Sequence, residues 1–290
     1  MSSETDQSSD SREKHGQNAS RATTLPIIGS LSMLAADTAA CVRFFSRLPL
    51  PKVNRSDDPA AAPRFQQIAA AAPLAGLAVA LPAAGLGTLL GYTALPAVAV
   101  VALVLAALCA TTGALHEDGL SDVADGFFGG STPARRLEIM KDSRIGAFGA
   151  LALVLTVVLR VSLLAVLWQK FSPADAALLF LSTEVISRAV LVWQWSQRPL
   201  ARPDGLAARF GKPDTGAAWK AALLAVPFVL PGTLLVSPTA VFLGLAIAVA
   251  AGFLIGRIAV AKIGGVTGDV LGAIQQICGL GFLLGMLMVP

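Results

Sequence analysis

Seven runs of predominantly apolar residues, each about 20 residues long, constrain this chain more than any other feature. A helical run of that length crosses the hydrocarbon core of a bilayer. Because lipid offers no water to the backbone, each run must bond its own amides and carbonyls, as a helix does. The expected spans cover residues 67–91, 95–115, 145–168, 174–196, 217–236, 239–257 and 270–289.

The composition agrees with this interpretation. Apolar residues make up 55% of the chain and charged residues only 14%, whereas a soluble domain carries roughly 25% charged residues. So few charges cannot cover the surface of a 290-residue chain in water. We therefore predict an all-α fold, a polytopic integral membrane bundle of about seven transmembrane helices.

The N-terminal region divides into two parts. Residues 1–26 are polar and are predicted to form a disordered tail. Residues 27–290 are predicted to form a single membrane-embedded domain. At its start, apolar residues recur at helical spacing between positions 27 and 48, which indicates a helix lying on the membrane surface.

Lysine and arginine residues are distributed unevenly among the segments between the spans. The segments before the first span and after the second, fourth and sixth, with the adjoining span ends, hold 19 of the 22. Such an excess marks the cytoplasmic side of a membrane protein. We therefore expect a multi-pass protein of the cell inner or plasma membrane, with its N-terminus and long loops in the cytoplasm. The net charge of +4 is explained without a nucleic-acid partner.

The residues after the second span form an acidic segment, from His116 to Asp142, at a membrane boundary. At 100° per residue, Asp118, Asp122 and Asp125 share one stripe of a helix. Like charges at this spacing repel each other, and hard carboxylate oxygens suit Mg²⁺, Mn²⁺ or Ca²⁺. We predict that the stripe holds one or two such ions above a phosphate. The alternative is a solvated acidic helix start, stabilised by the helix dipole.

Charged residues at the entry of the third span extend this candidate site. Asp142 is a candidate fourth carboxylate, either as a metal ligand or as a proton acceptor. Lys141 and Arg144 are donors suited to phosphate. The alternative role for both cations is that of ordinary anchors at a span end.

Two further features are weaker candidates. Glu184 and Arg188 lie at i and i+4 inside the fourth span, which predicts an intramembrane ion pair, although ionisable residues at that depth are also functional candidates. Gly264 and Gly265 precede Asp269 at the start of the last span. Glycines there permit a tight turn or a close approach of backbone amides to a phosphate.

These motifs resemble the cobalamin synthase family, whose formal name is adenosylcobinamide-GDP ribazoletransferase. The likeness rests mainly on ALHEDGLSDVADG at 114–126 and LEIMKDSRIG at 137–146. Shorter matches are FFSRLPLP at 44–51, DGL at 204–206 and GGVTGDVLGA at 264–273. Together the matching motifs span most of the chain after the polar tail.

The resemblance implies a Mg²⁺-dependent membrane transferase that completes the nucleotide loop of vitamin B12. Adenosylcobinamide-GDP would react with α-ribazole or α-ribazole 5′-phosphate, releasing GMP and forming adenosylcobalamin or its 5′-phosphate. Asp118, Asp122, Asp125 and Asp142 would bind Mg²⁺, with catalytic roles for Asp125, Asp142 and Arg144. The expected substrate- and phosphate-binding residues are Lys141, Ser143, Arg144, Arg188, Gly264, Gly265 and Asp269.

Two other functions compete with this one. A CDP-alcohol phosphotransferase-like enzyme also uses spaced aspartates at a span end, but no Ala-Arg follows Asp118-Gly119 here. A cation-coupled transporter would carry its ionisable groups near the bilayer midplane. One departure from some members of the cobalamin synthase family is the lack of a glutamate near the start of the last span, where this chain has Gln275, Gln276 and Gly279. The sequence leaves the oligomeric state open, a homo-oligomer included.

Overall fold

The computed structural model describes residues 26–202 and 205–289, and this part of the chain is almost entirely helical. Six of its helical segments are long and apolar enough to cross a membrane, and a bent pair of helices adds a seventh. The predicted all-α, multi-pass membrane bundle is therefore confirmed. The predicted tail lies outside the described residues except for its last residue, and its disorder stays a prediction.

The spans follow the predicted ones in number and order. They are α2–η1–α3 (Phe65–Ile68, Ala69–Ala71, Ala72–Gly91), α4 (Ala97–Thr112) with α5 (Leu115–Gly129), α7 (Ala147–Lys170), α8 (Pro173–Gln197), α10–η2–α11 (Thr215–Ala225, Val226–Val229, Leu230–Leu235), α12 (Pro238–Ile263) and α13 (Gly268–Leu287). The remaining helices are α1 (Pro26–Phe45), α6 (Pro133–Ile139) and α9 (Leu206–Arg209). Helix α12 runs to Ile263 rather than to residue 257.

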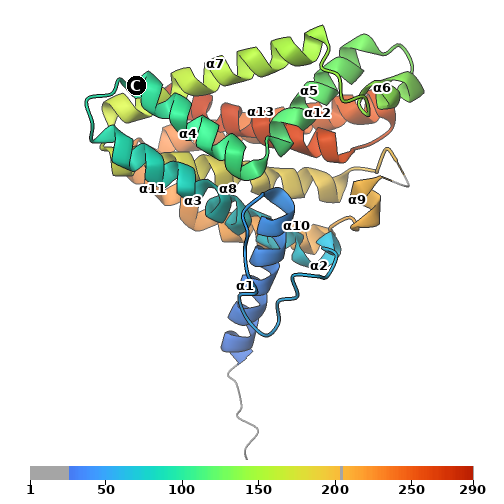
Figure 1. Ribbon diagram of the computed structural model, residues 1–290, viewed down its shortest axis with the longest axis horizontal. Helices are drawn as coiled ribbons and strands as arrows, with labels where there is room; N and C mark the ends of the chain where they lie inside the picture. The colour runs from blue at the N-terminus through green and yellow to red at the C-terminus, as the bar shows by residue number, and fades with distance from the viewer. Residues whose placement is uncertain (1–25, 203–204, 290) are drawn as a thin grey trace, which may run out of the picture.

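Two helices, α8 and α13, form the centre of the bundle. About five-sixths of the residues in their apolar windows are buried (83% in each), against 28% in α7 and 22% in α10–η2–α11. Figure 1 shows α13 running between α7 and α8. The outer helices expose large apolar side chains such as Leu151 and Leu155 on α7 and Phe242 on α12. Such a surface is stable only against lipid.

Small residues allow α12 and α13 to approach closely. A Cβ atom added at Gly285 would clash with the Cα atom of Gly244, so the two backbones touch at this crossing. Close approach of this kind is a main source of helix association in membranes, where lipid removes the hydrophobic driving force. The contact fixes α13, whose other end contributes to the candidate site.

Helix α1 runs across the direction of the long helices and projects from the bundle (Figure 1). This orientation agrees with the predicted helix on the membrane surface. The loop after α1 folds back on it, because the guanidinium of Arg43 donates hydrogen bonds to the Leu50 carbonyl, at 3.0 Å, and to the carboxylate of Asp57. The hydrogen bonds from Arg43 to its carboxylate lower the pKa of Asp57.

The second span differs from its prediction in one important way. Instead of continuing to residue 115, α4 ends at Thr112, and α5 leaves at 90° to it. The turn is made by Gly113 and Ala114, both in the left-handed region, with φ of 66° and 58°. Alanine is disfavoured there, so packing must hold the turn in place. The predicted polar segment after residue 115 is thus mostly helical, as α5 and α6.

Candidate active site

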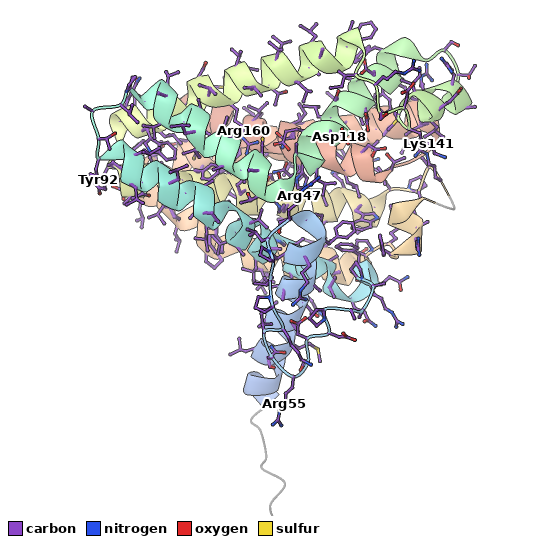
Figure 2. All side chains as sticks on the ribbon, in the orientation of Figure 1. Arg47, Arg55, Tyr92, Asp118, Lys141 and Arg160 are labelled. Atoms are coloured by element: carbon purple, nitrogen blue, oxygen red, sulfur yellow. The ribbon has the colours of Figure 1, made fainter. Side chains whose placement is uncertain are left out.

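The acidic segment forms α5, and α5 packs against the start of α13. A Cβ atom added at Gly119 would lie 2.7 Å from the backbone oxygen of Asp269, so only glycine allows this contact. Figure 2 shows Tyr92 and Lys141 at opposite ends of the bundle, with Asp118 nearer the Lys141 end. The three aspartates lie on one helix, as predicted, while their predicted place at a membrane boundary stays a prediction.

Asp118 and Asp122 lie one turn apart on α5, near the place where Gly119 touches the Asp269 backbone of α13, and we call these three aspartates the acid cluster. The charges of Asp118 and Asp269 both act on the carboxylate of Asp122. Asp118 is exposed and Asp122 is half-buried. Within the described residues, neither carboxylate accepts a hydrogen bond or joins an ion pair, whereas Asp269 accepts one bond from the Thr267 hydroxyl, at 3.1 Å. The carboxylates of Asp118 and Asp122 therefore have no direct cationic partner among the described residues.

The acid cluster fits a magnesium ion only as an open site. In the part of the chain that the structure describes, no three His, Cys, Asp or Glu side chains are placed to enclose a metal. Mg²⁺ usually takes one or two carboxylates and completes its shell with water and substrate phosphate oxygens. Asp118 and Asp122, one turn apart with uncommitted oxygens, are the pair in this region that meets that description.

Asp125, the third aspartate of the predicted stripe, has a different environment. It is buried, and its two carboxylate oxygens accept hydrogen bonds from the backbone amides of Gly146, at 2.7 Å, and Gly149, at 2.8 Å. Gly146 directly precedes α7 and Gly149 lies in its first turn, where free N–H groups and the helix dipole favour an anion. Asp125 therefore joins α5 to α7. Its predicted role as a metal ligand is not tested by this geometry, but its oxygens are already engaged.

This arrangement predicts that Asp125→Ala acts mainly on stability. Charge-assisted hydrogen bonds contribute roughly 1.5–3 kcal/mol each, and the variant leaves two α7 amides without partners. We expect the free energy of unfolding in detergent to fall by about 2–4 kcal/mol. Asp214→Ala, which removes the side-chain cap of α10, is the matched control and is expected to cost about 1 kcal/mol. Equal losses in the two variants would contradict the special role of Asp125.

Asp142 and Arg144 pair with each other in the α6–α7 loop. Two guanidinium nitrogens of Arg144 donate to the Asp142 carboxylate, the shorter bond being 2.6 Å. This pairing lowers the pKa of Asp142 to about 2. A carboxylate with so low a pKa is a weak proton acceptor at neutral pH. The predicted role of Asp142, as a metal ligand or as the base, stays a prediction.

The other predicted residues of this loop, Lys141 and Ser143, are exposed. Figure 2 shows Lys141 displaced from Asp118 toward the end of the bundle. Gly146, at the end of this loop, reaches α5 through Asp125, but no hydrogen bond among the described residues joins Lys141 or Ser143 to the acid cluster. The predicted role of the loop in binding phosphate stays a prediction.

Gly264 and Gly265 have clear backbone roles. Gly264 ends α12 in the left-handed region, with φ of 82°. A Cβ atom added at Gly265 would clash with the Pro199 carbonyl oxygen, and Val266 bonds to the backbone of the segment that follows α8. The close approach that the sequence suggested is therefore made to this chain's own backbone. Phosphate binding by these glycines stays untested.

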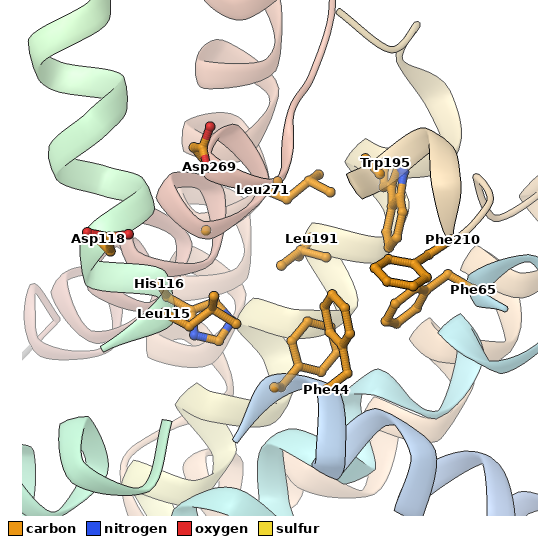
Figure 3. Close-up of a pocket in the computed structure, with 14 residues that line it drawn as sticks. Phe44, Phe65, Leu115, His116, Asp118, Leu191, Trp195, Phe210, Asp269 and Leu271 are labelled. Carbon is orange, nitrogen blue, oxygen red and sulfur yellow. The ribbon is translucent and has the colours of Figure 1, made fainter. Parts of the chain in front are cut away.

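A pocket opens beside the acid cluster, and Figure 3 shows how its residues lie. Its walls are mostly aromatic and aliphatic, while Asp118, Asp269 and His116 supply its carboxylate and imidazole groups. We call it the aromatic pocket. Its large apolar side chains come from α1, α2, α5, α8, α13 and the end of the α9 segment: Phe44, Phe45, Phe65, Leu115, Leu191, Trp195, Phe210 and Leu271.

The FFSRLPLP motif lies at the same place. Phe44 and Phe45 line the aromatic pocket, and the Arg47 amide donates to the Thr111 carbonyl at 2.7 Å. The Arg47 side chain covers the turn between α4 and α5, where a Cβ atom on Gly113 would clash with its Nε. Arg47 is exposed, and no carboxylate among the described residues pairs with it. A cation therefore stands at the start of α5.

A buried charge network lies deeper in the bundle. The Glu184 carboxylate pairs with Arg160 of α7 and, at 2.7 Å, with Arg188 of its own helix. Gln276 of α13 accepts from Arg160 at 3.0 Å and donates to Glu117 of α5 at 3.0 Å. The predicted pair of Glu184 and Arg188 is confirmed, and Figure 2 shows Arg160 midway along the bundle. The network ties α5 to the three helices around it.

Comparison with known sequences identifies the relatives of this chain. The sequence profile of the cobalamin-5-phosphate synthase family matches residues 37–287. The chain belongs to this family. It is 44% identical over 263 residues to the adenosylcobinamide-GDP ribazoletransferase of Azorhizobium caulinodans, covering 89% of this chain and 97% of that protein. The proteins of the same name from Brucella ovis and Brucella abortus are 43% identical over 268 residues, covering 88% of this chain and 97% of each. No solved structure matches.

In this member of the cobalamin-5-phosphate synthase family, the glutamines of α13 form part of the buried network. The buried network already balances two arginines, Arg160 and Arg188, with two glutamates, Glu117 and Glu184. Gln275 and Gln276 bridge these charges as neutral hydrogen-bonding groups. A glutamate at either position would add an unbalanced charge, so its absence from this chain has a structural explanation.

Several residues near the candidate site were not predicted from the sequence. Arg202 is the main example, because its positive charge attracts the carboxylates of both Asp122 and Asp269. Its guanidinium also donates a hydrogen bond to the Leu137 carbonyl at 2.6 Å. The aromatic pocket was missed as well. Neither has a local signal in the sequence, because each is assembled from segments far apart in the chain. Of the DGL motif, Asp204 lies outside the described residues.

Proposed function

We propose that this protein is a Mg²⁺-dependent adenosylcobinamide-GDP ribazoletransferase. The proposal is supported by the relatives that carry this name and by the acid cluster, whose carboxylates lie beside an aromatic pocket at the place where the family's motifs meet. A hydroxyl oxygen of α-ribazole, or of its 5′-phosphate, attacks the phosphorus atom attached to cobinamide. The hydroxyl proton is released to water or to a basic group, the bond from that phosphorus to the GMP oxygen breaks, GMP leaves, and adenosylcobalamin or its phosphate forms.

Both the attack of the hydroxyl and the departure of GMP require negative charge to be neutralised. The two phosphates of the donor and the attacking oxygen are all close to the reacting phosphorus. Asp118 and Asp122 are the proposed magnesium ligands, with Asp269 beside them. The bound ion would draw the phosphate oxygens together and stabilise the charge that develops on the leaving GMP. Arg47 and Arg202 are the nearby cations that we propose to bind and orient the phosphates.

The distribution of basic residues supports a particular membrane and a particular orientation of the protein in it. We propose that the protein lies in the cell inner membrane, with the acid cluster and the N-terminus on the cytoplasmic side. The segments around α1, α6 and α9 carry most of the lysines and arginines, as the positive-inside rule requires. Nucleotide-activated substrates are cytoplasmic, so this orientation gives them access to the site.

The test uses the full-length protein in lipid nanodiscs. Adenosylcobinamide-GDP and α-ribazole are supplied with Mg²⁺, and GMP and the corrinoid product are quantified by chromatography and mass spectrometry. We expect equal amounts of both products, no reaction with EDTA, and recovery when Mg²⁺ is restored. Transfer from a CDP-lipid to an alcohol, with no GMP from the cobinamide substrate, would overturn the proposal in favour of a phospholipid-type phosphotransferase.

A further inference from the structure

We propose that the aromatic pocket binds the planar heterocyclic base of the acceptor, α-ribazole. This inference rests on the proposed function and names the substrate group that the pocket takes. Both substrates carry a flat aromatic ring system that such a pocket could bind. These rings are the benzimidazole of α-ribazole and the guanine of the GDP-activated donor. The observations favour the benzimidazole.

The first observation is the arrangement of rings. Phe44 packs edge-on to Phe65 and Phe210, with centroids 4.8 Å and 5.4 Å apart, and Phe65 lies 5.0 Å from Trp195. The rings come from four separate segments of the chain, as Figure 3 shows for the labelled residues. Such walls bind flat heterocycles through stacking and edge contacts, which are tolerant of the exact base.

The second observation is a pair of buried nitrogen atoms without partners. His116 Nε2 and Trp195 Nε1 belong to residues that line the pocket, and no described residue forms a hydrogen bond with either. The two side chains are almost fully buried, with 3% and 4% of their surface exposed. A buried polar group without a partner is costly, and both side chains border the pocket, so we propose a ligand seated there as the partner of these nitrogens. An indole N–H can only donate, and a benzimidazole ring nitrogen accepts.

The third observation is the position of the acids. Asp118 and Asp269 belong both to the acid cluster and to the lining of the pocket. A base seated among the rings therefore carries its ribose, with the reacting hydroxyl, toward the proposed phosphate site. Guanine fits less well, because it presents several donors and acceptors along one edge, and the apolar walls offer few groups to satisfy them.

The experiment measures the KM of each substrate separately in GMP release by the nanodisc protein. Phe210→Ala removes one wall of the pocket, and Trp195→Phe removes one N–H group. We expect the KM for α-ribazole to rise roughly 10-fold or more in Phe210→Ala and about 3- to 10-fold in Trp195→Phe. The KM for adenosylcobinamide-GDP should stay within about 2-fold in both.

Trp193→Phe is the matched control, because Trp193 lies on the same helix but packs against Trp219, away from the pocket. It should leave both KM values unchanged. A rise in the KM for the GDP-activated donor instead would assign the pocket to guanine and overturn the proposal. Unchanged KM values in Phe210→Ala and Trp195→Phe would overturn it as well.

Direct binding separates this proposal from the proposed reaction and from misfolding. α-Ribazole added to the Trp193→Phe protein, without any donor, should quench the fluorescence of Trp195, and the quenching should be lost when Trp195 is also replaced by Phe. Quenching by GMP but not by α-ribazole would reject the proposal. Absence of GMP release by the wild-type protein would reject the proposed function alone, because the quenching result is obtained independently of turnover.

Discussion

Replacing Asp122 with asparagine is expected to lower the kcat of GMP release by roughly 100-fold or more. The substitution keeps the size of the side chain but removes one of the two free carboxylates that we propose as magnesium ligands. Asp118→Asn should have a similar effect. In both variants the Mg²⁺ concentration for half-maximal activity should also rise. Full activity of Asp122→Asn, or an unchanged Mg²⁺ requirement, would remove this residue from the proposed metal site.

The same substitutions are expected to leave the fold intact or to stabilise it slightly. Asp118 and Asp122 repel each other at i and i+4, which costs about 0.2–0.5 kcal/mol in a helix. Removing one charge should therefore raise the free energy of unfolding measured in EDTA, while activity falls. Asp58→Asn, in the exposed loop after α1, is the control and should change neither quantity. Loss of activity accompanied by loss of stability would indicate a structural role instead.

Replacing Glu184 with glutamine is expected to reduce the free energy of unfolding by about 3–5 kcal/mol. Glu184 is 1% exposed and is the direct partner of two buried arginines, Arg160 and Arg188. Its removal leaves two positive charges in the bundle, with only Glu117 nearby, 3.9 Å from Arg160. Unpaired buried charge is among the most costly defects in a protein, and low-dielectric surroundings increase the cost. Unfolding of the detergent-solubilised protein by heat or SDS would measure the change.

Glu138→Gln provides the matched control for this experiment. It makes the same chemical change and breaks the exposed ion pair with Arg135, whose atoms are 2.8 Å apart. Exposed pairs contribute only about 0–1 kcal/mol, so little effect is expected. Similar losses in Glu184→Gln and Glu138→Gln would contradict the importance of the buried network. Because this network includes Glu117, next to Asp118, we also expect Glu184→Gln to lower activity.

The membrane-spanning architecture could be predicted from the sequence because lipid imposes its requirement on each segment separately. A run such as residues 174–196 must satisfy its own backbone and present apolar side chains, whatever its neighbours are. The helical stripe of Asp118 and Asp122 was predictable for the same reason, since the helix period alone places them together. The i, i+4 pair of Glu184 and Arg188 is another local relation that the structure confirms.

Tertiary packing alone decided which residues form the acid cluster and the aromatic pocket. Asp269 joins Asp118 because Gly119 lets α13 touch α5, and Asp125 turns to the amides of α7 because that helix begins beside it. The break at Gly113 and Ala114 changes the direction of α5, although the hydrophobic run continues across it in the sequence. Such outcomes depend on which helices meet and at what distance. The local pattern of residues determines which segments are helical and which faces are charged, but the partner of each charge is fixed only when the helices pack.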